Sequence, residues 1–600
     1  MKRYINIIIL SALAATLCGC SDFLDTRMDV FQTMDRLETN SGNIANFAYA
    51  YYTPMRSGFD IIDGNLFASA SDEAEQTAST SEVQAFNRGL ISADRNPISY
   101  LYNNCYEGIR AAHFFLDFAK DGEEFLALNR DTATVYNPDG SIYATDKPRA
   151  YKRDCIDLGW RRAEARIAEA YYYGELIKMY GGVPIIDENA DGGYAEQASY
   201  DEVVEHIVKL IDENKDKVVL DWRAVVEPSA ENEVADVLNW NISDNVGRFD
   251  KTSALAIKAR VLLYVASPRN NSEGDLKKWE RAAEAANEVI QTRKAIFERG
   301  LGFGEAAYSI HPNYRMPANR DYGAYFQKNS STSDYESIFL IRSNAGSSLE
   351  VANYPIGTRG GQSGVCPTQN LVDAYEYIGP QTANPYQNRD PRFEATIVYN
   401  GSTWNGNEID ESPNGAYSQK VAGASKTGYY LKKFLAPNLN LVEGGSQVHV
   451  WPVFRYAEVL LNYAEAMNEA YGPDADPKGY GMTAREALTE VRNSASTKLA
   501  AVTTADKAEF RKAVKNERMV ELAFEDHRYW DLIRWNDAAS VLNKSIRGVV
   551  VRKNNLGGYQ YSYASVATRT FDADKHYYLP FTRKEITNSH GTLTQNPNYN

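Results

Sequence analysis

The chain has 600 residues, of which 24% are charged and 44% are hydrophobic, so it can bury a large core. Its 79 acidic and 64 basic residues give a net charge of −15. A chain without a basic surplus gains little by releasing counterions from a phosphate backbone, so we expect no nucleic-acid partner. Tyrosine is unusually frequent, with 41 Tyr against 40 Gly. Its apolar ring and polar tip suit a partly wet recognition surface.

The first segment of the chain predicts export. Lys2 and Arg3 precede an apolar stretch at 5–17, which is too short to cross roughly 30 Å of hydrocarbon and is typical of a secretory signal, here residues 1–19. The stretch closes with Leu-Cys-Gly before Cys20, which resembles a bacterial lipobox and predicts a lipid on Cys20. An ordinary signal peptide is the alternative. No later segment is apolar for the ~18 residues that a membrane span needs, so we expect attachment through lipid only.

Helices are predicted next, because apolar residues recur every three or four positions in two blocks of the chain. The helix through 163–177 should end at Gly181 and Gly182, before Pro184. Capping boxes at 199–202 and 483–486 should begin two others. Further helices are expected from Asn96-Pro97 through Phe118 and over 255–266, 279–289 and 457–467.

The chain between 298 and 449 has a different composition, in which Gly, Asn, Ser and Tyr crowd together and apolar runs such as 338–341 are short. Loops of that length are usually functional or disordered, and the aromatic content favours order. Short strands are also expected at 549–551 and 577–579. The helix spacing fits tetratricopeptide-like repeats of about 34 residues, with an irregular bundle as the alternative.

We therefore predict a mainly α fold, a tetratricopeptide-like helical superhelix with a loop-rich inserted domain that contains a few short strands. The expected division is a scaffold over 20–297 and 450–545, a ligand-binding insertion over 298–449, and a loop-rich C-terminal segment over 546–600.

Six motif regions lie in order along the whole chain. They are CSDFLD at 20–25, AEAR at 163–166 leading to YGGVP at 180–184, CPTQNLVD at 366–373, RYAEVLLNYAEA at 455–466, ER leading to EDHRYWDLIRW at 517–535, and QNPNY at 595–599. Together they resemble the SusD/RagB family of outer-membrane lipoproteins. The resemblance implies a nutrient-binding protein that faces the cell exterior and sits as a lid over a SusC-like, TonB-dependent transporter.

The function expected from this resemblance is non-catalytic glycan binding, with delivery of captured oligosaccharides to the transporter. Peptide binding by a lipoprotein of the same type is one alternative, and a surface glycoside hydrolase is another. No cofactor and no metal site are expected. The sparse Cys105, Cys155 and Cys366 form no disulfide framework and should be small buried hydrophobes.

Glu517, Glu521 and Glu525 stand four apart, on one face of a predicted helix. Two carboxyls at a suitable separation could serve a glycosidase. The other interpretation is an ion-pair network that fastens the helices and the following Trp530 and Trp535, with Arg518, Arg528 and Arg534 nearby. The motif is structural in the family that the chain resembles, and we predict that role here.

The predicted ligand site combines polar groups with aromatic rings, because a neutral sugar presents both hydroxyls and apolar C–H faces. A polar loop that precedes the helix carrying Tyr100 would supply hydrogen bonds, and an aromatic loop would supply stacking, although each Tyr alone could be a packing residue. Trp404 is a further candidate. If Tyr322 contacts ligand, Tyr322→Ala should weaken binding with little change in melting temperature. The predicted site residues are Asp72, Arg88, Asn96, Tyr314, Arg320, Tyr322 and Tyr325.

Overall fold

The computed structural model describes residues 46–120, 122–123, 146–186, 195–222, 245, 247–298, 322–327, 336–494 and 497–599. Cys20, Tyr314 and Arg320 lie outside these ranges, so the predictions that concern them stay predictions.

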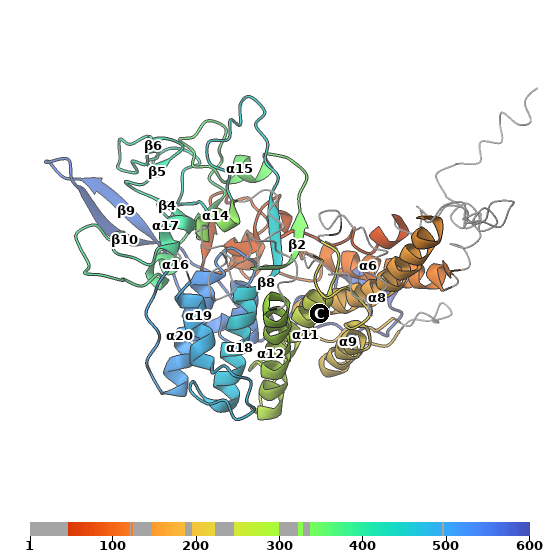
Figure 1. Cartoon of the computed structure of the whole chain (residues 1–600). Helices are drawn as coiled ribbons and strands as arrows, with labels where there is room; N and C mark the ends of the chain where they lie inside the picture. The colour runs from red at the N-terminus through yellow and green to blue at the C-terminus, as the bar shows by residue number, and fades with distance from the viewer. Residues whose placement is uncertain are drawn as a thin grey trace, which may run out of the picture.

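Long helices form one continuous row (Figure 1). Each contacts the next in the order α6, α8, α9, α11, α12 and α18, and α18 also contacts α19 and α20. Because each helix covers its neighbour, the apolar faces are buried along the whole row. The bounds are α6 Tyr100–Ala119, α8 Asp146–Tyr180, α9 Tyr200–Asn214, α11 Lys251–Ala266, α12 Leu276–Glu298, α18 Tyr456–Tyr471, α19 Ala484–Arg492 and α20 Lys507–Glu521.

The predicted helix ends are confirmed. The Ser199 hydroxyl accepts a hydrogen bond from the Glu202 backbone N–H, and the Glu202 carboxylate accepts one from the Ser199 N–H. Thr483 and Glu486 form the same capping box before α19. Helix α8 ends at Gly181, whose φ of 79° suits a residue without a side chain.

In the described part of the chain the strands are short and pair only in twos, always antiparallel. The pairs are β1 Ala74–Gln76 with β3 Val365–Pro367, β2 Ser337–Arg342 with β8 Val450–Arg455, β4 Ile397–Tyr399 with β7 Tyr429–Leu431, β5 Thr403–Trp404 with β6 Asn407–Glu408, and β9 Ile546–Lys553 with β10 Tyr559–Ala567. The strand predicted at 549–551 is confirmed within β9. The one predicted at 577–579 is wrong, because this stretch is a turn whose Leu579 N–H bonds to the carbonyl of Met179, beside the end of α8.

Short helices complete the described chain. They are η1 Gly58–Asp60, η2 Phe67–Ala70, α5 Gln84–Asn87, α14 Tyr322–Phe326, α15 Ser348–Asn353, α16 Gln369–Ala374, α17 Arg392–Thr396, α21 Arg528–Arg534, α22 Ala538–Leu542 and α23 Arg583–Asn588.

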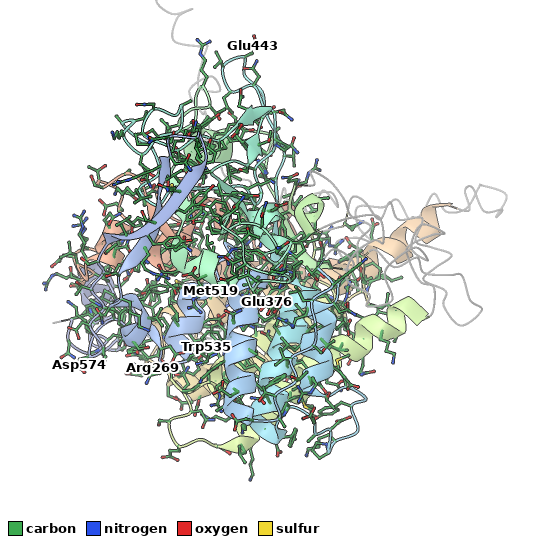
Figure 2. All side chains as sticks on the ribbon, turned by 90° about the vertical axis from the view of Figure 1, so that its left-hand side faces the viewer. Arg269, Glu376, Glu443, Met519, Trp535 and Asp574 are labelled. Atoms are coloured by element: carbon green, nitrogen blue, oxygen red, sulfur yellow. The ribbon has the colours of Figure 1, made fainter. Side chains whose placement is uncertain are left out.

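The loop-rich part lies over the end of the row formed by α18, α19 and α20 (Figure 1). Figure 2 shows Glu443 at the top of this part, with Glu376 and Met519 where it meets the helices. Strand β8 leads directly into α18, so Arg455 ends the strand and precedes the helix. The predicted mainly α, tetratricopeptide-like fold with few short strands is confirmed. None of the helices in the described ranges is long and apolar enough to cross a membrane.

Candidate functional site

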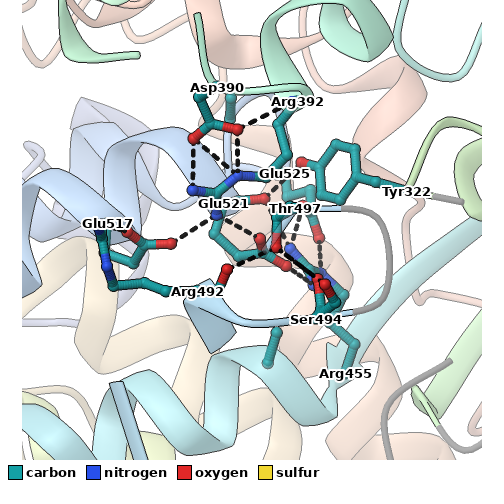
Figure 3. Close-up of polar contacts among 12 residues, drawn as sticks. Tyr322, Asp390, Arg392, Arg455, Arg492, Ser494, Thr497, Glu517, Glu521 and Glu525 are labelled. Carbon is teal, nitrogen blue, oxygen red and sulfur yellow. Dashed lines mark hydrogen bonds and ion pairs between the residues drawn. The ribbon is translucent and has the colours of Figure 1, made fainter. Parts of the chain in front are cut away.

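A buried ionic network joins the loop-rich part to α20 (Figure 3). Arg392 donates to Glu517 at 2.6 Å and to Glu521 at 2.7 Å. Arg455 donates to Glu525 at 2.6 Å and to Glu521 at 2.8 Å. Burial by itself would lower the pKa of both guanidiniums, but the surrounding carboxylates raise it well above its ordinary value. Arg392 and Arg455 therefore stay positively charged.

This geometry favours the structural interpretation of the three glutamates, since each is engaged by a buried cation rather than open to a substrate. The arginines that lie near these glutamates in the sequence are not their ion-pair partners, however. Arg518 and Arg534 pair with Asp531 instead, at 2.8 Å each. The cations that meet the glutamates come from distant segments, namely Arg392, Lys433, Arg455 and Arg492.

Asp526, which follows Glu525 in the chain, has a raised pKa. Burial raises the pKa of Asp526 from 3.8 to about 6, although Lys178 partly offsets the rise. One of its oxygens, Oδ1, has no hydrogen-bond partner among the residues that the structure describes.

The substitution Asp526→Asn should change how stability depends on pH. The folded wild type keeps the Asp526 proton more tightly than the unfolded chain, so this group's contribution is fully present below pH 4 and is lost as pH rises through about 6. Relative to wild type, the variant should gain about 1–3 kcal/mol of unfolding free energy between pH 4 and pH 7.5. Urea unfolding of both proteins across this range measures the difference, and a difference that stays constant with pH would contradict the raised pKa.

Two of the predicted polar ligand residues are engaged inside the protein. The Asp72 carboxylate receives two hydrogen bonds from Arg528, at 2.8 and 3.0 Å. Burial acts to raise the pKa of Asp72, and Arg528 more than offsets this and lowers it. The Asn96 amide donates to the carbonyl of Pro580 at 3.3 Å. Both side chains are buried, which contradicts direct ligand contact, whereas Arg88 is exposed.

Tyr322 and Tyr325 are core residues, each only 3% exposed. The Tyr322 hydroxyl donates to the carbonyl of Glu521 at 2.7 Å, and both rings pack edge-on against Phe326. Trp404 is buried against Tyr354. These rings offer no face to a ligand, so their predicted stacking role is wrong. The described members of the predicted site do not form one surface.

An open groove runs along α6 instead, and we call it the α6 groove. Its volume is about 710 Å³. Helical spacing of three and four places one face of α6 along it, opposite Pro184, Ile186, Ala195 and the chain around α23. The lining residues are Tyr102, Asn103, Tyr106, Ile109, Arg110, His113, Phe114, Asp117, Pro184, Ile186, Ala195, Glu585, Asn588, Ser589, Thr592 and Leu593.

The walls of the α6 groove carry two kinds of group. Aromatic rings are fixed there by contacts with neighbouring residues, and polar side chains are exposed. The Tyr106 hydroxyl donates to the carbonyl of Pro184 at 2.7 Å, and its ring lies 4.9 Å from that of Tyr102. Phe114 stacks on a neighbouring ring and is still 52% exposed. Asn103 and Arg110 are exposed donors between these rings. Aromatic faces beside hydrogen-bonding groups are suited to a hydroxylated ligand.

Sequence reasoning missed this groove. The available signal was the helical spacing of Asn103, Tyr106, Arg110 and Phe114 within a predicted helix. The opposite wall comes from the far end of the chain, so no local pattern could predict it. Within the described residues, no three His, Cys, Asp or Glu side chains are placed to hold a metal ion.

The fold and the groove define a helical-repeat scaffold with an open recognition groove. Residues 323–599 match the SusD family. SusD-like protein P38 from Formosa agariphila is 22% identical over 399 residues, which cover 63% of this chain and 67% of that protein.

Solved structures have the same fold. A SusD-like carbohydrate-binding protein from Bacteroides fragilis is 21% identical with a TM-score of 0.65, covering 92% of this chain and 99% of its own. Surface glycan-binding protein A from Bacteroides fluxus is also 21% identical, with a TM-score of 0.59 and coverage of 94% and 100%. The family match over residues 323–599, the SusD-like relative and this fold together support the SusD/RagB family for this chain.

Proposed function

We propose that this protein is a non-catalytic, cell-surface glycan-binding lipoprotein, and that the α6 groove holds the oligosaccharide. The observation that carries the proposal is the groove itself, in which the rings of Tyr106 and Phe114 lie beside the exposed donors Asn103 and Arg110. The family match supports it, since relatives of the same fold are named carbohydrate-binding and surface glycan-binding proteins.

The proposal extends to location and partner. A lipid on Cys20 would anchor the protein in the outer membrane, facing the exterior, and a SusC-like, TonB-dependent transporter would receive the oligosaccharide. The lipobox-like motif before Cys20 supports the anchor. A non-catalytic role agrees with the network, in which Glu517, Glu521 and Glu525 are committed to buried cations.

Titration calorimetry of the pure chain against oligosaccharides of plant, host and microbial origin tests this function. Saturable binding of at least one is expected, without release of reducing ends. Failure on every glycan, together with peptides found by mass spectrometry in the purified protein, would favour the peptide-binding alternative. Release of reducing ends would favour a hydrolase.

Variants in the α6 groove should lose affinity without losing stability. Arg110→Ala and Phe114→Ala each remove an exposed group, so we expect about tenfold weaker oligosaccharide binding, or ~1.4 kcal/mol, at an unchanged melting temperature. Lys512→Ala, an exposed change on α20, is the matched control and should bind as wild type does.

Arg88→Ala separates the groove from the loop predicted by sequence, because Arg88 is exposed on that loop. If Arg88→Ala weakens binding while the two groove variants do not, the ligand lies on the loop and the groove assignment is wrong.

A further inference from the structure

A second cavity, partly open to solvent, lies on the other side of α6, and we call it the inner chamber. It has about 80 Å³ open to the centres of water-sized molecules, room for about five waters. It shares no lining residue with the α6 groove. The side chains that matter here are Asn104, Glu175, Lys178, Arg260, Asp526 and Trp530.

The Trp530 indole lies close enough to the Asp526 carboxyl to act on its pKa, lowering it. Within the described residues, three polar atoms on the wall of the chamber have no hydrogen-bond partner. They are Nδ2 of Asn104, Nε1 of Trp530 and Oδ1 of Asp526. Trp530 is only 4% exposed, so its indole N–H has little access to bulk water. Buried polar groups are nearly always bonded, because leaving one unpaired costs free energy. Two donors and one acceptor on the wall of one cavity therefore point to a bound molecule, or guest, that both accepts and donates hydrogen bonds.

Asp526 is held at this position by an unusual backbone. Phe524 and Asp526 both have positive φ, 65° and 61°, which non-glycine residues rarely adopt. The strained turn places the Asp526 carboxyl on the chamber wall beside Trp530. Such strain persists only where surrounding contacts maintain it.

The charged groups around the chamber are mostly paired with one another. Lys178 lies 2.5 Å from Glu175 and also faces the Trp530 ring at 5.2 Å, and Arg260 donates to Glu458 at 2.6 Å. An anion would meet Glu175, Glu525 and Asp526, and a cation would meet Lys178 and Arg260. The chamber thus disfavours either net charge and favours an uncharged guest.

We propose that the inner chamber binds a small uncharged polyhydroxy compound, a polyol or single sugar ring, whose hydroxyls accept hydrogen bonds from Asn104 and Trp530 and donate one to Asp526. Tyr171, Tyr264 and Trp451 supply aromatic carbon on the wall for its C–H groups. The lining includes the exposed Arg56, from segment 54–61, and the half-buried Leu101, from α6. This site does not depend on what the α6 groove binds.

The test uses the full chain, with glycerol, myo-inositol, glucose and galactose as probes, followed by calorimetry and tryptophan fluorescence. At least one probe should bind saturably. Asn104→Leu and Asp526→Asn should each weaken that binding about tenfold, whereas the groove variant Arg110→Ala should leave it unchanged. Melting temperatures show that each variant is folded, and oligosaccharide binding by the two chamber variants should stay as in wild type.

Three results would overturn the proposal. The first is no saturable binding of any probe. The second is an effect of Arg110→Ala as large as that of Asn104→Leu, which would place the probe in the groove. The third is a crystal structure, grown with the best probe, whose chamber holds ordered water only.

Discussion

Replacing Arg455 with methionine should lower the free energy of unfolding by about 3–5 kcal/mol. The Arg455 guanidinium donates to three buried carboxylates, those of Glu336, Glu521 and Glu525, at 2.6 to 2.8 Å. Methionine matches much of the volume but leaves those charges uncompensated inside the protein. Removing one partner of a buried network is costly for this reason, even where the intact network adds little net stability.

Urea unfolding of wild type and variant measures this loss. Arg583→Met is the matched control, because Arg583 pairs with Asp94 at 2.5 Å while both side chains are more than 60% exposed. Water screens that pair, so its loss should leave the free energy of unfolding nearly unchanged. Equal effects of the two substitutions would show that burial does not set the cost.

Tyr322→Ala should lower the free energy of unfolding by about 3–5 kcal/mol, since a fully buried ring would leave a cavity. The substitution also removes the hydroxyl that donates to the Glu521 carbonyl and accepts from Lys433 at 2.8 Å. Burial lowers the pKa of Lys433 to about 8, although the Glu525 carboxylate opposes the shift. Without the Tyr322 hydroxyl, the Lys433 ammonium would lose one of the hydrogen bonds that stabilise its charge.

Thermal unfolding and oligosaccharide titration together test the role of Tyr322. The melting temperature of Tyr322→Ala should fall clearly, while affinity measured below the transition should match wild type. Tyr322→Phe keeps the ring and should lose only about 1–2 kcal/mol. If affinity falls and stability does not, the ligand-contact role predicted from sequence is right and the core assignment is wrong.

The helices could be predicted from the sequence because their signals are local. The capping boxes at Ser199 and Thr483 and the stop at Gly181 each lie within a few residues of the feature they define. The predicted division of the chain at 297, 449 and 545 stays a prediction. A change in amino-acid composition does not show which contacts separate one domain from another.

The carboxylates of α20 show what a local sequence pattern can and cannot predict. Spacing placed Glu517, Glu521 and Glu525 on one helix face. The structure confirms this for Glu517 and Glu521, but α20 ends at Glu521 and Glu525 lies in the turn that follows. Their partners Arg392 and Arg455 are far away in sequence, and only the packing of the loop-rich part on α20 brings them together. The two walls of the α6 groove meet in the same way.

The sequence by itself determined the helical scaffold, its caps and the family resemblance, because each depends on the spacing of residues that are close together in the chain. The tertiary structure alone decided which aromatic and polar side chains face solvent. Tyr322 and Asp72 are buried, whereas Phe114 and Arg110 are exposed on α6. Burial is set by neighbours from distant parts of the chain, so residue type cannot reveal it. The abundance of tyrosine therefore predicted a recognition surface but not its position.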